Sequence, residues 1–398
     1  MSTLFYLLKE TFIISLMKRY YCLLFIVFLL GACKHRSVFH DDNITIINFA
    51  QKSHNNIEEL LETDFIKLET CDNSLIGSYV AQIEAVKEKL FILTGGTHIK
   101  LLVFDVSGKF DCSIGNVGRG PGEYIVPISF SVNYNDNIIS IVDIAQKKII
   151  NYNLDNYEFV TEKIMEYDSF CFEYFGNDKI VWKNANYRDK LSDWDFIVTD
   201  IEQNFFKKHI QRDFKTGYFT GPPKNIYKTN GHVYAYTQYN PIVYHFFNDD
   251  VVPVYQIKFG KHKMPPLDYL QKISAENNNF ISTLTASNFI SYYCVFDAVR
   301  TLSIFYSVSQ NQYIGVFDKI NKQLYHYSKD AFQDKLKIGE MERPVGIIDN
   351  YVVALIHPYY LLEKIEEGYV LDNRLYPLVS NSKADDNPFL FLFRFKEL

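Results

Sequence analysis

Short apolar runs alternate with polar turns along most of the chain. One unit reads KLFILTGG and continues as HIKLLVFDVSGKFDCSIG, and comparable units follow as far as the C-terminus. Apolar segments of this length, bounded by turn residues, indicate strands rather than helices. The pattern therefore predicts an all-β chain of consecutive antiparallel strands.

The strand units repeat at a nearly constant spacing. An Asp or Asn follows the third strand of successive units, with steps of 50, 45, 48 and 70 residues between Asp105, Asp155, Asp200, Asn248 and Asp318. A propeller blade of four strands is about 40–50 residues long. We therefore predict that residues 61–398 form a six-bladed β-propeller of four-stranded antiparallel blades.

The longest step contains the segment KMPPLDYLQKISAENNNFISTL. Within it, Leu267, Leu270 and Ile273 are spaced as on one face of a helix, and a pair of prolines precedes them. We expect a short helical insertion between blades near residues 265–285. Without this insertion the repeat length is roughly restored.

The two ends of the propeller region offer strands that could close the ring. Near the C-terminus, NPFLFLFRFKEL places four phenylalanines on one face of a strand, at positions 389, 391, 393 and 395. The segment DFIKLET, residues 64–70, is the strand available at the N-terminal end. We predict that these two strands pair.

Composition agrees with a large β domain and excludes one partner class. The chain is 47% hydrophobic, 22% charged and 16% aromatic, which supports a large core and favours strands. The formal net charge of −6 provides no basic surface for nucleic acid. We therefore expect no nucleic-acid partner.

The N-terminus looks like a targeting segment. Lys18 and Arg19 precede the apolar run CLLFIVFLL, and the tetrad Leu30-Gly31-Ala32-Cys33 resembles a bacterial lipobox, in which the Cys is diacylated. We expect residues 1–32 to be a lipoprotein signal peptide, with translation starting at Met17 as one alternative. Residues 33–60 would then be a linker tethered to the membrane through Cys33. An uncleaved apolar anchor is the other alternative.

The segment after Cys33 bears on localisation. Surface-exposed lipoproteins of gut anaerobes often carry an acidic run there, whereas Lys34, His35 and Arg36 are basic. We expect a lipoprotein of the cell envelope, held at the outer membrane and facing the periplasm.

One glycine-rich segment, GNVGRGPGEYIVP, lies between the first two predicted blades. Its glycines permit positive φ and its proline fixes φ near −65°. We expect a sharp turn near the ring axis, formed by Gly118, Arg119, Gly120, Pro121, Gly122, Glu123 and Tyr124. The alternative is that Arg119 and Glu123 line the mouth of the central channel and meet a polar ligand.

This segment also carries a family resemblance. The glycine lead is followed by Tyr124, Pro127, Asp143, Lys148 and Ile149, and this order resembles an NHL-type propeller blade. Together with the lipobox and the C-terminal strand, the chain looks like the six-bladed β-propeller lipoproteins of gut Bacteroidetes. The resemblance implies the fold but no ligand, and the other blades lack the glycine lead.

No catalytic motif is found in the sequence. HExxH and GxSxG are absent, and the cysteines of the mature chain are isolated, so no zinc site or redox motif is indicated. Buried free thiols or one or two disulfides are both open for Cys71, Cys112, Cys171 and Cys294.

Besides a sensor or anchor attached to a polysaccharide-uptake system, two functions from different classes remain. The first is a non-enzymatic binding or scaffold module for a protein or glycan partner, working without a cofactor. The second is a Ca²⁺-dependent hydrolase or lactonase, because six-bladed enzymes of that kind hold calcium in the channel. The candidate calcium ligands are Glu123, Asn137, Asp143 and Asn240. The tyrosine-rich segments could stack on sugars, or they could only pack the blades.

Overall fold

The computed structural model describes residues 44–50, 56–176, 178–185, 191–215, 224–247, 250–276 and 279–397. Residues 44–398 form one compact unit. The predicted signal peptide, the alternative start at Met17 and the lipidation site at Cys33 lie outside the described residues. Within the described part of the chain, no helix is both long enough and apolar enough to span a bilayer.

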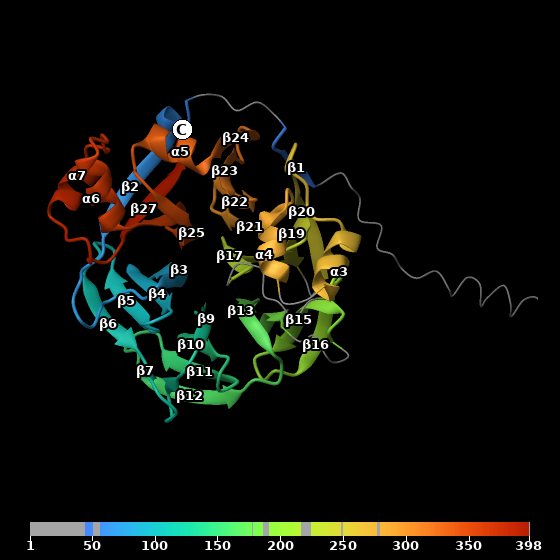
Figure 1. The fold of residues 1–398 in the computed structure, drawn as a ribbon. Coiled ribbons are helices and arrows are strands. Elements are labelled where there is room, and N and C mark those ends of the chain that lie inside the picture. Colours follow the sequence, from blue (N-terminus) through green and yellow to red (C-terminus); the bar gives the residue numbers. More distant parts are fainter. Residues whose placement is uncertain are drawn as a thin grey trace, which may run out of the picture. The chain divides into compact units, whose positions relative to one another are not determined.

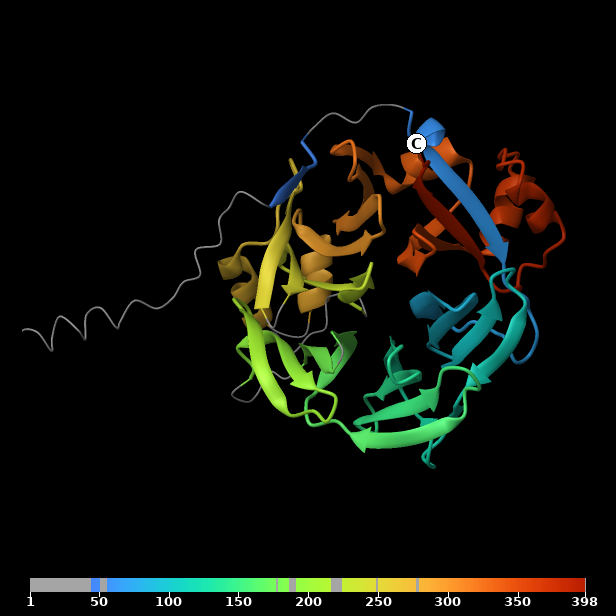
Figure 2. The ribbon, with the colours of Figure 1, turned by 180° about the vertical axis from the view of Figure 1, so that it is seen from behind.

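Six four-stranded antiparallel blades are arranged in a ring (Figures 1 and 2), as the repeat spacing predicts. Blade 1 consists of β3 (Tyr79–Val86), β4 (Lys89–Gly95), β5 (Leu101–Asp105) and β6 (Phe110–Ile114). Blade 2 consists of β9 (Pro127–Asn133), β10 (Ile138–Asp143), β11 (Lys148–Asn153) and β12 (Phe159–Ile164). Blade 3 consists of β13 (Ser169–Phe175), β14 (Lys179–Asn184), β15 (Trp194–Asp200) and β16 (Phe205–Gln211).

The second half of the ring follows the same plan. Blade 4 consists of β17 (Ile226–Thr229), β18 (His232–Thr237), β19 (Asn240–Phe247) and β20 (Asp250–Lys258). Blade 5 consists of β21 (Ile290–Asp297), β22 (Thr301–Val308), β23 (Asn311–Asp318) and β24 (Gln323–Ser328). Blade 6 consists of β25 (Met341–Ile348), β26 (Tyr351–Ile356), β27 (Phe389–Phe395) and the N-terminal strand β2 (Leu61–Lys67).

The turn residues used to count the blades occupy equivalent places. Asp105, Asp200 and Asp318 end the third strands of blades 1, 3 and 5, and Asp155 follows the third strand of blade 2. The carboxylates of Asp105, Asp200 and Asp318 accept backbone N–H groups within their turns; Asp105, for example, accepts from Ser107 at 2.8 Å. The Asp155 carboxylate instead accepts from the side chains of Lys87 and Asn137. Asn248 lies outside the described residues.

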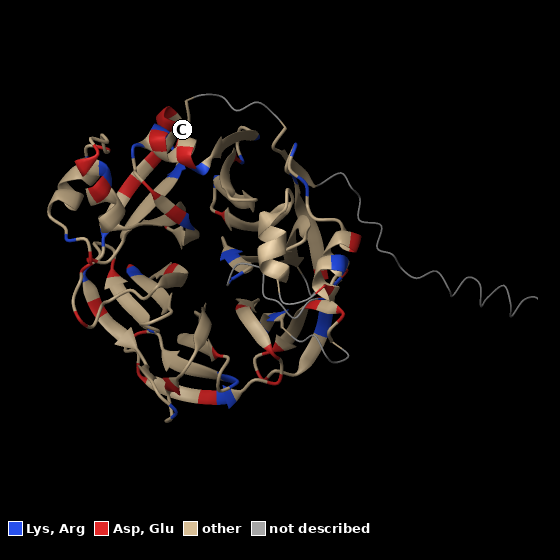
Figure 3. Cartoon of the chain, in the orientation of Figure 1, with Lys and Arg blue, Asp and Glu red and all other residues tan. Residues whose placement is uncertain are grey.

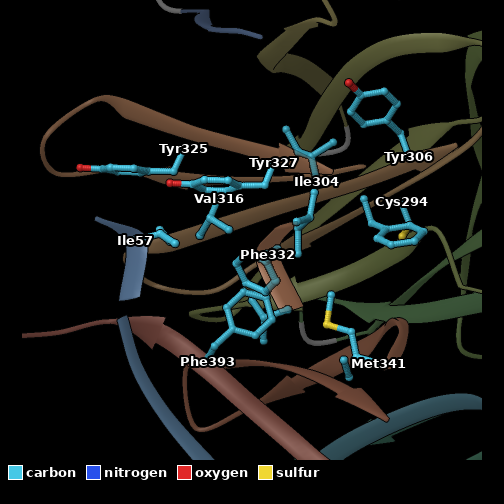
Figure 4. Close-up of a cluster of buried hydrophobic side chains, with 14 of the residues drawn as sticks. Ile57, Cys294, Ile304, Tyr306, Val316, Tyr325, Tyr327, Phe332, Met341 and Phe393 are labelled. Carbon is cyan, nitrogen blue, oxygen red and sulfur yellow. The ribbon is translucent and has the colours of Figure 1, made fainter. Parts of the chain in front are cut away.

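The ring is closed by the predicted pairing of its two ends. Strand β2 pairs antiparallel with β27 over its full length, from Leu61 opposite Phe395 to Lys67 opposite Phe389. The two faces of β27 contribute to different interblade cores. Phe393 points towards Phe332, with ring centroids 5.5 Å apart, and belongs to the cluster shared with blade 5 (Figure 4). Leu390 and Leu392 pack into the cluster shared with blade 1.

Blades 6 and 1 are joined in a way that the repeat pattern did not predict. Their inner strands β25 and β3 pair in parallel, with Gly346 opposite Ile83, so the two blades share one eight-stranded sheet. A Cβ atom at position 346 would overlap both the side chain and the carbonyl oxygen of Ile83. The absence of a side chain at Gly346 therefore permits this close approach.

Part of the expected linker belongs to the propeller. Strand β1 (Thr45–Asn48) adds in parallel to the outer strand β20 of blade 4, and a single helical turn, α2 (Ile57–Leu60), precedes β2. The buried ring of Phe49 lies 4.7 Å from the ring of His326 and 5.4 Å from that of Tyr306, centroid to centroid. Phe49 thus anchors this segment in the core of blade 5.

The helical insertion is confirmed, and further helices occur. Helices α3 (Leu267–Ala275) and α4 (Phe280–Ala286) lie between blades 4 and 5. The repeat pattern does not predict α5 (Lys329–Leu336), α6 (Pro358–Glu366) or α7 (Leu375–Ser380). Local signals are nevertheless present, because the Ser328 side chain caps α5 and Pro358 occupies the first turn of α6.

Candidate functional site

The ring axis contains a cavity of about 610 Å³, lined by residues from the inner-strand region of every blade. Val132, Glu173 and Val295 come from the C-terminal halves of their strands, and Asn230 and Gly231 come from the hairpin after β17. The lining residues of β3 and β25 reach from near the start of these strands to near their ends, so the cavity extends along the inner strands. Because six elements build its wall, propeller closure is needed to form it.

A network of charged side chains crosses this cavity. Lys224, just before β17, places Nζ 2.6 Å from Oε1 of Glu84 on β3 and 3.0 Å from Oε2 of Glu173 on β13. Lys228 on β17 lies 3.2 Å from the other oxygen of Glu173. Figure 3 shows the cationic positions of β17 close to the ring centre. The network thus links blades 1, 3 and 4 through one ammonium group.

Uncharged groups hold the two carboxylates in place. Gln82 donates from Nε2 to Oε1 of Glu84 at 2.8 Å and to the Phe130 carbonyl oxygen at 2.8 Å. The Ser131 hydroxyl donates to Oε1 of Glu173 at 2.5 Å. Charge-assisted hydrogen bonds of this kind fix geometry as well as charge.

The surroundings keep Glu173 ionised. Burial opposes its negative charge, but Lys224, Lys228 and the hydroxyl of Ser131 outweigh burial and lower the pKa of Glu173 below its usual 4.5. Burial likewise opposes the charge of Lys224, and the two carboxylates raise its pKa above 10.5. Both groups are therefore charged at neutral pH.

Arg343 on β25 is the third cation that lines the cavity. Its guanidinium lies over the ring of Tyr292, 5.8 Å from the centroid, in a cation–π arrangement. Among the described residues it forms neither an ion pair nor a hydrogen bond. The carboxylates of Glu84 and Glu173 are occupied by lysines, and Oε1 of the adjacent Glu342 lies 2.8 Å from Nε2 of His357.

Aromatic rings cover much of the remaining wall. Tyr134, Tyr174, Tyr227 and Phe296 line the cavity. The hydroxyls of Tyr174 and Ser140 lie 2.6 Å apart, and burial raises the pKa of Tyr174 to about 12. Tyr134 is 57% exposed. The cavity combines flat apolar surface with fixed charge.

The glycine-rich segment lies elsewhere. It forms a small parallel pair, β7 (Asn116–Val117) with β8 (Glu123–Tyr124), beside the outer strand β12 at the ring periphery (Figure 1). Gly122 has a φ of +71° and donates its N–H to Oε2 of Glu162 on β12. We expected this turn near the ring axis, and that position was wrong. None of the seven motif residues lines the cavity, so the alternative of a channel mouth at Arg119 and Glu123 is not what the structure shows.

The motif residues instead stabilise the turn. The Glu123 carboxylate accepts the N–H of Gly120 at 2.7 Å, and Tyr124 donates its hydroxyl to the Ile114 carbonyl oxygen. Asp143 accepts the N–H groups of Ile125 and Val126 at 2.8 and 3.0 Å. The NHL-like order of glycines, Tyr and Asp is therefore explained by local hydrogen bonding.

The candidate calcium ligands have separate surroundings. Asn137 donates to Asp155, while Asn240 donates to the Tyr244 hydroxyl in blade 4. Among the described residues, no group of three or more His, Cys, Asp or Glu side chains is placed to hold a metal. The structure therefore does not bring these four candidates together as one site.

The four cysteines of the described chain are all free thiols. Cys171 and Cys294 are buried, and burial raises the pKa of Cys294 to about 12. Cys112 is partly buried and Cys71 is exposed, so the expectation of buried thiols holds for two of the four.

Sequence reasoning missed the residues that do line the channel: Glu84, Glu173, Lys224, Lys228 and Arg343. A signal was present, since QIEAV and SFCFEYF each carry one carboxylate inside an otherwise apolar inner strand. Both carboxylates lie on the innermost strand of their blade and line the channel cavity.

The comparisons with known proteins agree with this architecture. A family model described as a 6-bladed beta-propeller, DUF5128, matches residues 34–355. A solved structure from Bacteroides fragilis NCTC 9343, of a protein whose name calls it exported, is 36% identical with a TM-score of 0.85. It covers 89% of this chain and 100% of its own.

A more distant structure, of a duf4221 family member from Bacteroides vulgatus ATCC 8482, is 11% identical with a TM-score of 0.48, covering 85% of this chain and 99% of its own. No curated protein matches the sequence. The family model spans well over half of the chain, and the Bacteroides fragilis protein spans most of it. The resemblance inferred from the lipobox, the glycine segment and the C-terminal strand is thus confirmed at the family level: this chain belongs to the six-bladed β-propeller family DUF5128.

Proposed function

We propose that this protein is a non-enzymatic binding module of the cell envelope and that its central channel receives the ligand. The observation that carries the proposal is the cavity of about 610 Å³ on the ring axis, walled by all six blades. Ligand pockets typically have volumes of roughly 300–1,000 Å³, so this cavity suits a small molecule or the end of a larger one.

The arrangement of charges favours binding over chemistry. A carboxyl group that acts in acid–base catalysis must be able to exchange a proton with a substrate near the working pH. Glu84 and Glu173 are both held by Lys224, and the pKa of Glu173 is lowered by its lysine partners after opposing burial. These carboxylates serve to order the wall of the channel.

The aromatic lining favours a glycan as the ligand. Tyr134, Tyr174, Tyr227 and Phe296 offer ring faces for the apolar sides of sugar rings, while Asn230 adds an amide at the hairpin end. A protein partner that docks on the same face is the other outcome that the experiment below can reveal.

We also propose that Cys33 carries the lipid anchor and holds the propeller at the outer membrane on its periplasmic side. The lipobox sequence and the basic segment after it support this placement, and the Bacteroides fragilis relative is named as exported. Strand β1 starts at Thr45, so the tether between lipid and propeller is short.

Thermal unfolding of residues 34–398 with a panel of glycans tests the proposal. A ligand at 100 times its Kd adds about 2.7 kcal/mol to the stability of the folded state. Ala81→Trp fills the cavity and should abolish the shift, whereas Asn73→Trp, on an exposed loop, should preserve it.

Three results would count against the proposal. A glycan shift that survives Ala81→Trp places the ligand outside the channel. If no glycan of the panel shifts the melting temperature and an envelope protein crosslinks to the propeller, the ligand is a protein and not a glycan. Loss of stability in EDTA, restored by Ca²⁺, would favour the calcium-dependent hydrolase instead.

A further inference from the structure

Three cations and two carboxylates line the channel cavity, and their pairing is uneven. Lys224 contacts both Glu84 and Glu173, and Lys228 takes the remaining oxygen of Glu173. Arg343 forms no ion pair among the described residues, and its sequence neighbour Glu342 lies 2.8 Å from Nε2 of His357. One cation therefore faces the cavity without a direct partner.

An unpaired charge in such a place is unfavourable for the free protein. Arg343 is partly buried on β25, and the ring of Tyr292 covers one face of its guanidinium. Removal of a charge from water costs free energy unless a counter-charge or hydrogen-bond acceptors replace the solvent. A guanidinium remains protonated at any physiological pH, so the charge cannot be lost by titration.

We propose that the channel ligand carries an oxyanion group, a carboxylate, sulfate or phosphate, and that Arg343 is the residue that binds it. This inference rests on the proposed function, since it names the chemistry of the ligand in the same cavity. The planar guanidinium can donate two parallel hydrogen bonds to such a group. Lys228, whose side chain is 28% exposed, adds positive potential to the same cavity.

Ligands of other charge fit less well. A cation would meet an excess of positive charge and two carboxylates that are already paired. A neutral ligand would displace water from Arg343 without supplying a counter-charge. An anion compensates the charge and leaves the lysine–glutamate network intact.

The experiment compares ligands that share one sugar ring. Calorimetric titration of residues 34–398 with glucose, glucuronate, glucose 6-sulfate and glucose 6-phosphate isolates the effect of the anionic group. Inorganic phosphate, sulfate and acetate, followed by thermal shift, test the anion site without any sugar. The three anionic sugars also separate carboxylate, sulfate and phosphate as the source of the oxyanion.

Variants identify the residue that binds. Arg343→Gln should weaken binding of the preferred anion at least tenfold, and Arg343→Lys should lose part of that affinity because it keeps the charge but not the planar donor pair. Arg119→Gln removes an exposed arginine from the ring periphery and should change nothing. A cooperative melt of each variant shows that the loss is not due to unfolding.

The outcomes separate this inference from the proposed function. If glucose binds the wild-type protein as tightly as its anionic derivatives do, the proposed anion site is wrong, but glycan binding in the channel is still supported. Anion binding that survives Arg343→Gln places the anion elsewhere and also overturns the inference. If no anion of either series binds, the inference fails, and the glycan panel decides the proposed function independently.

Discussion

The Nζ atom of Lys224 lies 2.6 Å from Oε1 of Glu84, although 140 positions separate the two residues in the sequence. The same ammonium group lies 3.0 Å from Glu173. One lysine therefore connects three blades across the channel, and each of its partners is held by further hydrogen bonds. This contact exists only when the ring is closed.

Glu173→Gln should destabilise the protein strongly. The substitution leaves Lys224 and Lys228 without their shared counter-charge in a buried place, and removal of one partner of a buried pair costs about 3–5 kcal/mol. The matched control is Glu202→Gln, which breaks the exposed pair with Lys163 and should cost less than about 1 kcal/mol. Urea unfolding followed by circular dichroism measures both, and equal effects would contradict a stabilising role for the network.

Stability should fall as the pH drops from 6.5 towards 4. Burial, with smaller effects of His262 and Lys261, lowers the pKa of His326 from 6.5 to about 4. The unfolded chain therefore binds a proton in this window more readily than the folded chain, so the stability present above pH 6.5 is lost on acidification.

The neighbours of His326 in this pocket are the Tyr306 hydroxyl, 3.0 Å from Nε2, and the rings of Phe49 and Tyr313. His326→Gln should flatten the pH dependence of the melting temperature between pH 6.5 and 4. His98→Gln, in the turn between β4 and β5, serves as the control and should keep it. An unchanged slope in His326→Gln would assign the effect to another group.

Deletion of residues 387–398 should abolish cooperative unfolding. The deletion removes β27, which leaves β2 without a partner and exposes one edge of β26, so the four-stranded blade 6 cannot form. Removal of residues 397–398 alone, beyond the end of β27, should leave the transition unchanged. Thermal and urea melts measure the difference, and a cooperative transition in the longer deletion would mean that the ring closes by other contacts.

Phe49→Ala should release β1 from blade 4. The Phe49 ring is 5% exposed and packs on Phe259, Tyr306 and His326, so its removal forfeits most of what holds this segment. Truncation of a buried Phe typically costs about 3–5 kcal/mol. Hydrogen exchange of the β1 amides should accelerate accordingly, whereas Phe247→Ala, at a 54% exposed ring, should leave it unchanged. Protection of β1 that persists in Phe49→Ala would show that the pairing with β20 suffices.

The repeat spacing predicted the fold because blade strands and turns are local features. Aspartates that bend a hairpin, the helical spacing around Leu270 and the alternation in FLFLFRF all act within a few residues, so the sequence displays them directly. The pairing of β2 with β27 could also be predicted, since a propeller needs a strand to complete its last blade.

The channel site could not be predicted in the same way. Lys224 meets Glu84 and Glu173 only through the ring, and no spacing in the sequence encodes which charges meet. The glycine-rich segment has an unusual composition, yet hydrogen bonds to Asp143 and Glu162 hold it at the ring periphery. The parallel pairing of β25 with β3 depends on Gly346 lying opposite Ile83. The sequence alone does not indicate this contact.

The closure through β2 and β27 also determines how the chain can fold after export. Glu62 on β2 contacts Arg394 on β27, 332 positions later, so blade 6 is complete only after these distant strands have paired. A chain that emerges N-terminus first therefore keeps β2 as an unpaired edge strand throughout its translocation, exposed to association with other chains. Long-range pairing of this kind slows folding. The final strand of this protein is thus the step at which an envelope chaperone would protect it most effectively.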